Sequence, residues 1–266
     1  MQKIVLYVVI LSCFFSSCEK VIDIKLNDAE KKYVVEGVLT DQPGSCRVLL
    51  SQTKSFTDGN SFAGVGGATV FITDNSNNTT VLSEDSAGVY TSDTLTGIVG
   101  KVYTLNLNIN GTTFTASSVM PTKVNMDSLY ITQENLFGEI RKTTNVEYLD
   151  PVGVGNNYRF VLYVNGVKKK NIFIGNDDYS DGNVSVDKLF LFGDEDDNKQ
   201  LKTGDQVKTE MLCISSPVYK YWYSLSEGAT GDNNSASPAN PVSNISRGAL
   251  GYFSAHTIQS KMVTVP

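Results

Sequence analysis

The sequence is poor in the side chains from which many catalytic and metal centres are built. Its 266 residues include one histidine, four cysteines and one tryptophan. A Ser-His-Asp triad needs a histidine between a nucleophile and an acid. The single histidine, His256, lies beside Ser254 in a strand-like run, where side chains this close in sequence do not form a triad. A zinc site needs several histidine or cysteine ligands. We therefore expect no catalytic residue, no metal site and no cofactor.

Features of nucleotide and nucleic-acid binding are also missing. The glycines of "FAGVGGATV" (62–70) precede a strand, and no Lys-Ser/Thr pair follows them, which excludes a phosphate-binding loop. The formal net charge is −6, whereas binding to a phosphate backbone requires a basic face. We expect no nucleic acid among the partners.

The apolar run at the N-terminus is too short for a membrane-spanning helix, which needs roughly 18–20 residues. Residues 4–15 are mostly apolar, follow Lys3, and end at the small residues 16–17. This order is typical of a secretory signal, whose apolar region is about 7–15 residues long. The sequence "FSSC" resembles the bacterial lipobox, in which the cysteine, here Cys18, receives a diacylglycerol and becomes the new N-terminus.

These features predict a lipoprotein signal peptide over residues 1–17, lipidation of Cys18, and a charged tether over 18–32. Several acyl chains, such as palmitate, together give stable anchoring because each buried methylene contributes about 0.8 kcal/mol. An ordinary secretory peptide, with no role for Cys18, is the alternative.

Two further cysteines, Cys46 and Cys213, lie in apolar, strand-like runs. We interpret them as small buried hydrophobic side chains. A disulfide between them is the alternative in an oxidising compartment.

Short strands separated by turn residues fill the first half of the mature chain. Asn110-Gly111 is a strong hairpin signal between two alternating runs. This spacing is typical of a β-sandwich, so we predict an immunoglobulin/transthyretin-like sandwich over residues 33–121. The predicted strands are 33–40, 46–54, 68–74, 89–93, 102–109 and 112–120.

Residues 122–266 form a second predicted domain, again mostly β and sandwich-like. It contains one short predicted α-helix, 217–227, with Pro217 suited to its first turn and Gly228 to its end. Its aromatic residues, among them Trp222, are interpreted as packing the helix onto a sheet. Stacking on a sugar is the alternative.

Two acidic stretches are candidate calcium loops. "NDDYSDGN" (176–183) begins like one, but position 12 counted from Asp177 is Lys188 where a bidentate glutamate is required, so the match fails. "GDEDDNKQ" (193–200) is interpreted as a hydrated turn, because clustered like charges prefer solvent. Adventitious calcium binding is the alternative there.

Three tripeptides resemble an O-glycosylation signal that some Gram-negative bacteria use on exported proteins. Each consists of aspartate, a hydroxyl residue and a small or aliphatic residue. The predicted modification sites are Ser86, Thr94 and Ser128.

Segments along the mature chain resemble the domain-of-unknown-function 4249 family of bacterial outer-membrane lipoproteins. They include "CEKVIDIKL", "YVVEGVLTDQPG", "GATVFITD", "DSLYI", "YKYWYSL" and "ANPVSNISRGALGYFSAHTIQSKMVTVP". Arg247 departs from the pattern, since a glycine is more frequent there. The resemblance implies an outer-membrane protein that is encoded beside TonB-dependent transporters and has an accessory role in surface capture or uptake. It supplies no catalytic residues.

We therefore expect an accessory or ligand-capture subunit, anchored to the outer membrane through Cys18 and exposed at the surface rather than in the periplasm. Its expected partners are a TonB-dependent β-barrel transporter and an unidentified nutrient. Asn240, Pro241, Asn244 and Ile245, in the long loop 229–248, are the predicted partner surface. Internal packing of that loop is the alternative.

Two other functions stay open. One is a surface hydrolase that acts on a glycan or peptide through carboxylates of the C-terminal domain. A deep cleft with two facing carboxylates would favour it. The other is a purely structural, adhesin-like surface protein.

Overall fold

The computed structural model describes residues 30–55, 62–136, 138–191, 200–229 and 240–266. Residues 31–266 form one compact unit. The predicted signal peptide, Cys18 and most of the tether lie outside the described residues, as does nearly all of the acidic stretch 193–200. The described part of the chain is mostly β, which confirms the predicted fold class. No helix in it is long and apolar enough to cross a membrane.

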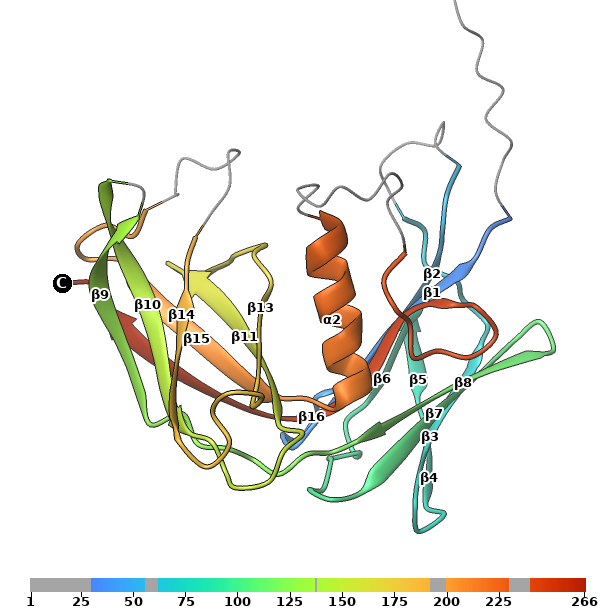
Figure 1. Ribbon diagram of the computed structural model, residues 1–266. Coiled ribbons are helices and arrows are strands. Elements are labelled where there is room, and N and C mark those ends of the chain that lie inside the picture. Colours follow the sequence, from blue (N-terminus) through green and yellow to red (C-terminus); the bar gives the residue numbers. More distant parts are fainter. Residues whose placement is uncertain (1–29, 56–61, 137, 192–199, 230–239) are drawn as a thin grey trace, which may run out of the picture. The chain divides into compact units, whose positions relative to one another are not determined.

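One large sheet runs through the whole of this unit (Figure 1). Its strands lie in the order β12-β11-β15-β16-β1-β2-β6-β5, and β13 pairs with β11. The strands are β1 (Tyr33–Thr40), β2 (Cys46–Gln52), β5 (Ser83–Ser86), β6 (Val89–Ser92), β11 (Asn157–Val164), β12 (Val167–Lys168), β13 (Phe173–Asn176), β15 (Gln206–Cys213) and β16 (Leu250–Thr264).

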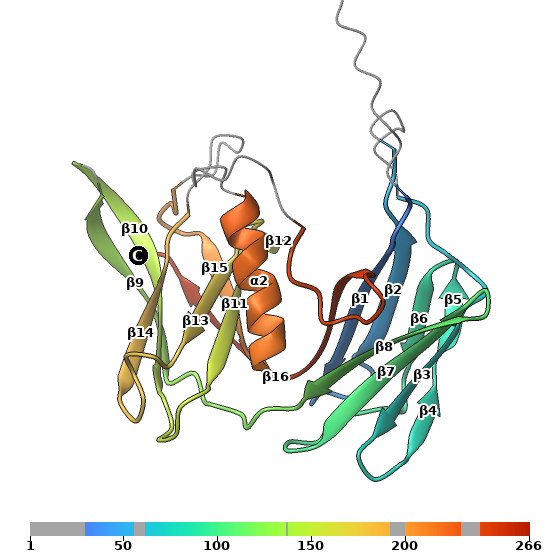
Figure 2. The ribbon, with the colours of Figure 1, turned by 45° about the vertical axis from the view of Figure 1, so that its right-hand side comes forward.

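The final strand, β16, joins the two halves of this sheet. Residues 250–256 pair in parallel with β1, and residues 257–264 pair antiparallel with β15. Gly251 permits the close approach to β1: its φ is +94°, and a Cβ there would lie 1.9 Å from the carbonyl oxygen of Val35. In Figures 1 and 2, β16 passes beneath the helix from one group of strands to the other.

A four-stranded sheet packs on the large sheet to form the first sandwich. Its strands are β4 (Thr79–Val81), β3 (Thr69–Asp74), β7 (Val102–Ile109) and β8 (Thr112–Val119). The core between the sheets includes Val35, Leu50 and Leu105, and also Ile245 and Phe253 from the end of the chain. A β-sandwich is therefore present, and its core draws on residues beyond 121. The domain boundary at 121 and the immunoglobulin/transthyretin-like topology stay predictions.

A three-stranded sheet packs on the other end of the large sheet. Its strands are β14 (Val184–Leu189), β10 (Glu139–Leu149) and β9 (Ser128–Leu136). Val146 and Tyr148 of β10 contact Phe160 of β11 and Met211 of β15 in a second core. Side chains alternate between the faces of a strand, and the register of β15 with β16 places both cores on the same face of the large sheet.

The helix α2 (Ser216–Ala229) packs on the opposite face, against β11 and β16 (Figures 1 and 2). It confirms the predicted helix 217–227; the observed helix begins one residue earlier and ends two residues later. The carbonyl of Ser215 accepts the first intrahelical hydrogen bond, from Tyr219, at 2.9 Å. Val218 is fully buried there, and the ring of Trp222 lies 5.2 Å from that of Tyr252. The aromatic residues of α2 therefore pack on the sheet, as the sequence indicated.

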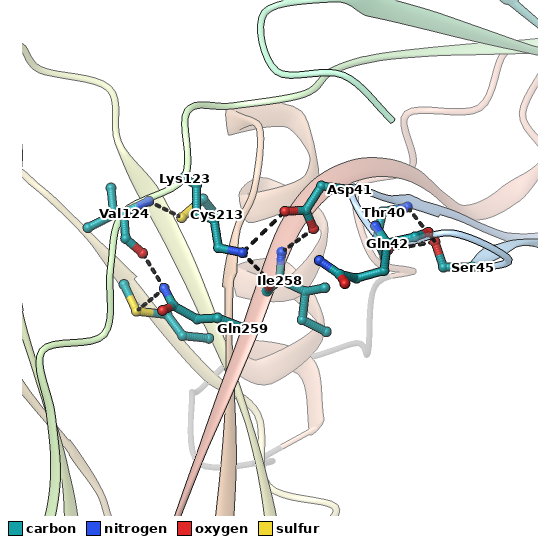
Figure 3. Close-up of polar contacts among 10 residues, drawn as sticks. Thr40, Asp41, Gln42, Ser45, Lys123, Val124, Cys213, Ile258 and Gln259 are labelled. Carbon is teal, nitrogen blue, oxygen red and sulfur yellow. Dashed lines mark hydrogen bonds and ion pairs between the residues drawn. The ribbon is translucent and has the colours of Figure 1, made fainter. Parts of the chain in front are cut away.

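Polar side chains fix the point where β16 changes partner (Figure 3). Asp41, directly after β1, accepts a hydrogen bond from the Ile258 N–H at 3.0 Å, and Lys123 Nζ lies 3.3 Å from the same carboxylate. Gln259 donates to the Val124 carbonyl, and the Val124 N–H donates to Cys213 Sγ at 3.3 Å. The segment around residue 123 therefore crosses β16 and is held to it by hydrogen bonds.

Several local predictions agree with the backbone. Asn110 and Gly111 have φ values of 49° and 81° in the turn between β7 and β8, as the hairpin signal requires. Arg247 has a φ of 57°, the left-handed conformation that favours glycine. Cys46 and Cys213 are buried and free, so the interpretation as buried side chains is confirmed.

Candidate functional site

A pocket of about 230 Å³ lies on the face of the large sheet that faces α2. Because side chains alternate along each strand, the residues next to the core residues point to this side. Five strands (β1, β11, β12, β15 and β16) and the helix therefore converge on one cavity. Its lining consists of Val38, Thr40, Arg159, Val161, Lys168, Glu210, Leu212, Ile214, Trp222, Tyr252, Ser254, His256 and Ile258.

Arg159 is the charged residue of an otherwise apolar strand. Its neighbours Tyr158 and Phe160 point into the second core, so Arg159 points toward the helix. The guanidinium carbon lies 3.4 Å from the ring centroid of Trp222, which is a close cation–π stack. Its Nε is enclosed and has no hydrogen-bond partner, and no ion pair joins Arg159 to a described residue within 4.0 Å. An enclosed, unpaired donor is costly.

The charges around Arg159 leave the pocket positive. The carboxylate of Glu210 lies 2.7 Å from Lys208 Nζ and accepts the Tyr163 hydroxyl at 3.1 Å. Lys168 adds a second cation to the lining. Burial lowers the pKa of Arg159, and nearby Tyr252 and Glu210 oppose that shift. A guanidinium nevertheless stays protonated in proteins, so the pocket offers a fixed positive charge.

Ser254 and His256 lie on the pocket face of β16. The Ser254 hydroxyl is 2.9 Å from His256 Nδ1. Both side chains are buried. Burial, and then the charge of Arg159, lower the pKa of His256 to about 4. The structure therefore brings these residues together as a neutral pair. Asp41, whose charge acts on His256, is itself bonded to the Ile258 N–H and Lys123, so a triad is not formed among the described residues.

The predicted modification sites lie at different depths. Ser86 and Thr94 are exposed, and Ser128 is half-buried at the start of β9. Thr94 Oγ1 lies 3.3 Å from Ser92 Oγ. Glycosylation of the three positions stays a prediction, as does lipidation of Cys18, which lies outside the described residues.

The predicted partner surface is divided by the fold. Ile245 is 5% exposed and belongs to the first core. The Asn244 side chain donates to the Phe253 carbonyl at 2.8 Å and accepts from the Phe253 N–H at 2.9 Å. Asn240 is exposed and Pro241 half-buried. The alternative of internal packing therefore describes Asn244 and Ile245, and only Asn240 and Pro241 are left to contact a partner.

Sequence reasoning did not find the pocket. The available signal was an arginine inside the apolar run "YRFVLYV" (158–164), because a charged residue is rarely buried unless a partner compensates it. The partners of Arg159 come from α2 and β16, about 60 and 90 residues further along the chain, and no local pattern connects them.

The fold and the pocket define a mostly β protein in which two sandwiches share one sheet and an arginine pocket lies under the single described helix. The family described as "Domain of unknown function (DUF4249)" matches residues 19–262. The chain belongs to this family. No curated protein matches the sequence.

Proposed function

We propose that the protein is a lipid-anchored, non-enzymatic subunit at the outer membrane that captures a nutrient for a TonB-dependent transporter. The N-terminal order of charge, apolar run, small residues and Cys18 supports the anchor. The resemblance to outer-membrane lipoproteins supports the transporter and a surface-exposed position. The observation that carries ligand capture is the enclosed guanidinium of Arg159, which has no protein partner on its Nε.

The chemistry of the pocket specifies the ligand class. A guanidinium binds a carboxylate through two parallel N–H···O bonds, and the stack on Trp222 fixes the plane in which those bonds point. Tyr252, Val161 and Leu212 add an apolar wall. The volume of about 230 Å³ lies just below the roughly 300–1,000 Å³ of typical small-molecule sites. The proposed ligand is a small carboxylate, or the carboxylate end of a longer molecule.

Capture explains the pocket better than hydrolysis through paired carboxylates. Among the lining residues Glu210 is the only acid, whereas glycoside hydrolysis requires two facing acids. The Ser254–His256 pair is buried and has no acid bonded to the imidazole among the described residues.

Copurification tests the partner. The native lipoprotein is isolated from gently solubilised outer membrane, and mass spectrometry identifies what accompanies it. We expect a TonB-dependent β-barrel in stoichiometric amount. Cys18→Ser should release the protein from the membrane fraction, whereas the barrel, which spans the bilayer, should stay there and no longer copurify with it. A fully membrane-bound Cys18→Ser protein would contradict the anchor, and absence of a barrel from the wild-type preparation would contradict the transporter role.

The pocket is tested with benzoate as probe and benzyl alcohol as its uncharged counterpart, by calorimetric titration of the full chain. We expect benzoate to bind the wild type and Arg159→Met to lose at least tenfold in affinity. Arg47→Met is the matched control, because Arg47 is exposed on β2. Equal binding of benzyl alcohol, or equal loss in both variants, would contradict an anion site at Arg159.

A further inference from the structure

We propose that Asp150, Asp177 and Asp181 form a calcium site, distinct from the arginine pocket. One carboxylate oxygen from each residue lies within 4.8 Å of the others. None of the three residues lines the arginine pocket.

Two loops bring these carboxylates together. Asp150 directly follows β10, and Asp177 and Asp181 lie in the turn between β13 and β14. The Asp150 N–H donates to the Asn183 carbonyl at 3.0 Å, and the Asp181 N–H donates to the Asp177 carbonyl at 3.2 Å. The turn is therefore closed on itself and bonded to the end of β10. These contacts hold the acids close without contributing any positive charge.

The cluster contains enclosed oxygen atoms that the protein leaves without partners. Asp150 is 1% exposed, and its Oδ1 accepts the Tyr158 hydroxyl, but its Oδ2 is enclosed and accepts no hydrogen bond. The hydroxyl oxygen of Ser180, in the same turn, is enclosed and unpartnered as well. Buried polar atoms normally have a partner, so an enclosed carboxylate oxygen indicates a missing donor or cation.

The electrostatics indicate a cation rather than a donor. Asp177 and Asp181 place two further negative charges beside the buried carboxylate of Asp150. Among the described residues, no lysine or arginine forms an ion pair with any of the three carboxylates. Three carboxylates this close, two of them buried, repel one another strongly at low local dielectric. A divalent cation would turn that repulsion into attraction.

Each carboxylate is already oriented through one of its oxygens. Asp177 Oδ2 accepts the N–H groups of Gly155 and Asn156 at 2.6 and 2.8 Å, and Asp181 Oδ1 accepts that of Gly153 at 2.6 Å. The second oxygen of each carboxylate accepts no hydrogen bond from a described residue. Such outer contacts are typical of groups that hold a metal ligand in position.

The donor set selects calcium. Oxygen ligands alone suit hard cations, not zinc or copper. Calcium accepts six to eight oxygens at about 2.3–2.6 Å in irregular geometry, and loop carbonyls and water can complete the shell. Magnesium requires a near-octahedral shell at about 2.0–2.1 Å. Three carboxylates on two irregular loops fit the larger, more tolerant ion.

Thermal unfolding of the full chain tests the site, after removal of divalent ions with EGTA and then with calcium added. At a calcium concentration about 100 times the dissociation constant, Tm should rise by about 5 °C. Asp181→Asn should lose most of this rise. Asp178→Asn is the matched control, because Asp178 is an exposed acid of the same turn outside the cluster, and it should keep the full rise.

The direction in which Asp181→Asn changes Tm, with and without calcium, distinguishes a calcium ligand from a structural residue. In EGTA, Asp181→Asn should melt at or above the wild-type Tm because one repelling charge is gone; in calcium it should melt below. A lower Tm under both conditions would overturn the proposal. It would also be overturned if calcium gave no rise in the wild type, if magnesium gave an equal rise, or if Asp178→Asn lost the rise to the same extent.

Discussion

The two sandwiches share one sheet but differ in whether their buried polar groups have hydrogen-bond partners. In the first, the buried polar side chains Thr40, Ser92 and Ser118 all have partners: Ser45, the Leu95 N–H and the Ala255 N–H. In the described part of the chain, all enclosed side-chain polar atoms without a partner belong to residues in the second half of the sequence. They belong to Thr144, Asp150, Arg159, Ser180, Thr209 and Thr257.

This difference coincides with the positions of the two proposed sites. An enclosed unpartnered polar group costs about 1–3 kcal/mol, and proteins tolerate such departures mainly where function requires them. Arg159 and Asp150, one a cation and the other an acid, are the charged members of the set. They identify the two proposed sites. The shared strand β16 connects the regions, since Phe253 lies in the first core and His256 in the pocket.

The largest expected effect tests the first core. Phe253 is fully buried, so Phe253→Ala should cost about 3–5 kcal/mol in the free energy of unfolding. Met262→Ala, on the same strand but 66% exposed, is the control and should change little. Urea unfolding measures both. Because β16 pairs with β1 and β15, we expect one transition in each protein, and separate transitions for the two halves would refute their coupling through this strand.

A smaller effect should follow from the buried imidazole of the pocket. The pKa of His256 is about 4 in the folded chain and about 6.5 when unfolded. Protonation therefore favours the unfolded chain, and stability present above pH 6.5 is lost as pH falls toward 4. Between pH 7.5 and 5 this group should cost the wild type about 2 kcal/mol.

His256→Gln removes that titration and keeps a polar group for Ser254. The difference between variant and wild type isolates the imidazole, because every other titrating group is common to both proteins. Urea unfolding at the two pH values should show the wild type losing about 2 kcal/mol more than the variant. The same loss in both would mean that the imidazole is not enclosed beside Arg159.

Local structure was predictable because local rules govern it. The alternating runs, the hairpin at Asn110-Gly111 and the helix starting near Pro217 depend on nearby residues, and the structure agrees with each of them. The glycine-favouring position of Arg247 came from the family resemblance, and its φ of 57° supplies the physical reason.

The candidate sites were not predictable in this way because each is assembled across the chain. β16 pairs with two strands more than 200 and about 50 residues earlier. The calcium-loop comparison at 176–183 considered contiguous ligands and therefore missed Asp150, which arrives from the end of β10. The sequence shows a charged residue, Arg159, in an apolar strand, but it does not show which side chains surround that residue in the fold.

Two buried tyrosines, one in each half, bond their hydroxyl groups to different kinds of partner. The Tyr90 hydroxyl donates to the Val65 carbonyl at 3.1 Å and accepts the Ala68 N–H at 3.0 Å, whereas the Tyr158 hydroxyl donates to Asp150. A hydrogen bond to a charged group contributes more than a neutral one. In EGTA, Tyr158→Phe, which removes one bond to a charged group, should therefore cost at least as much in urea unfolding as Tyr90→Phe, which removes two neutral bonds. A clearly smaller cost for Tyr158→Phe would mean that Asp150 carries no charge in the folded chain, and the contrast between the halves would then rest on Arg159 alone.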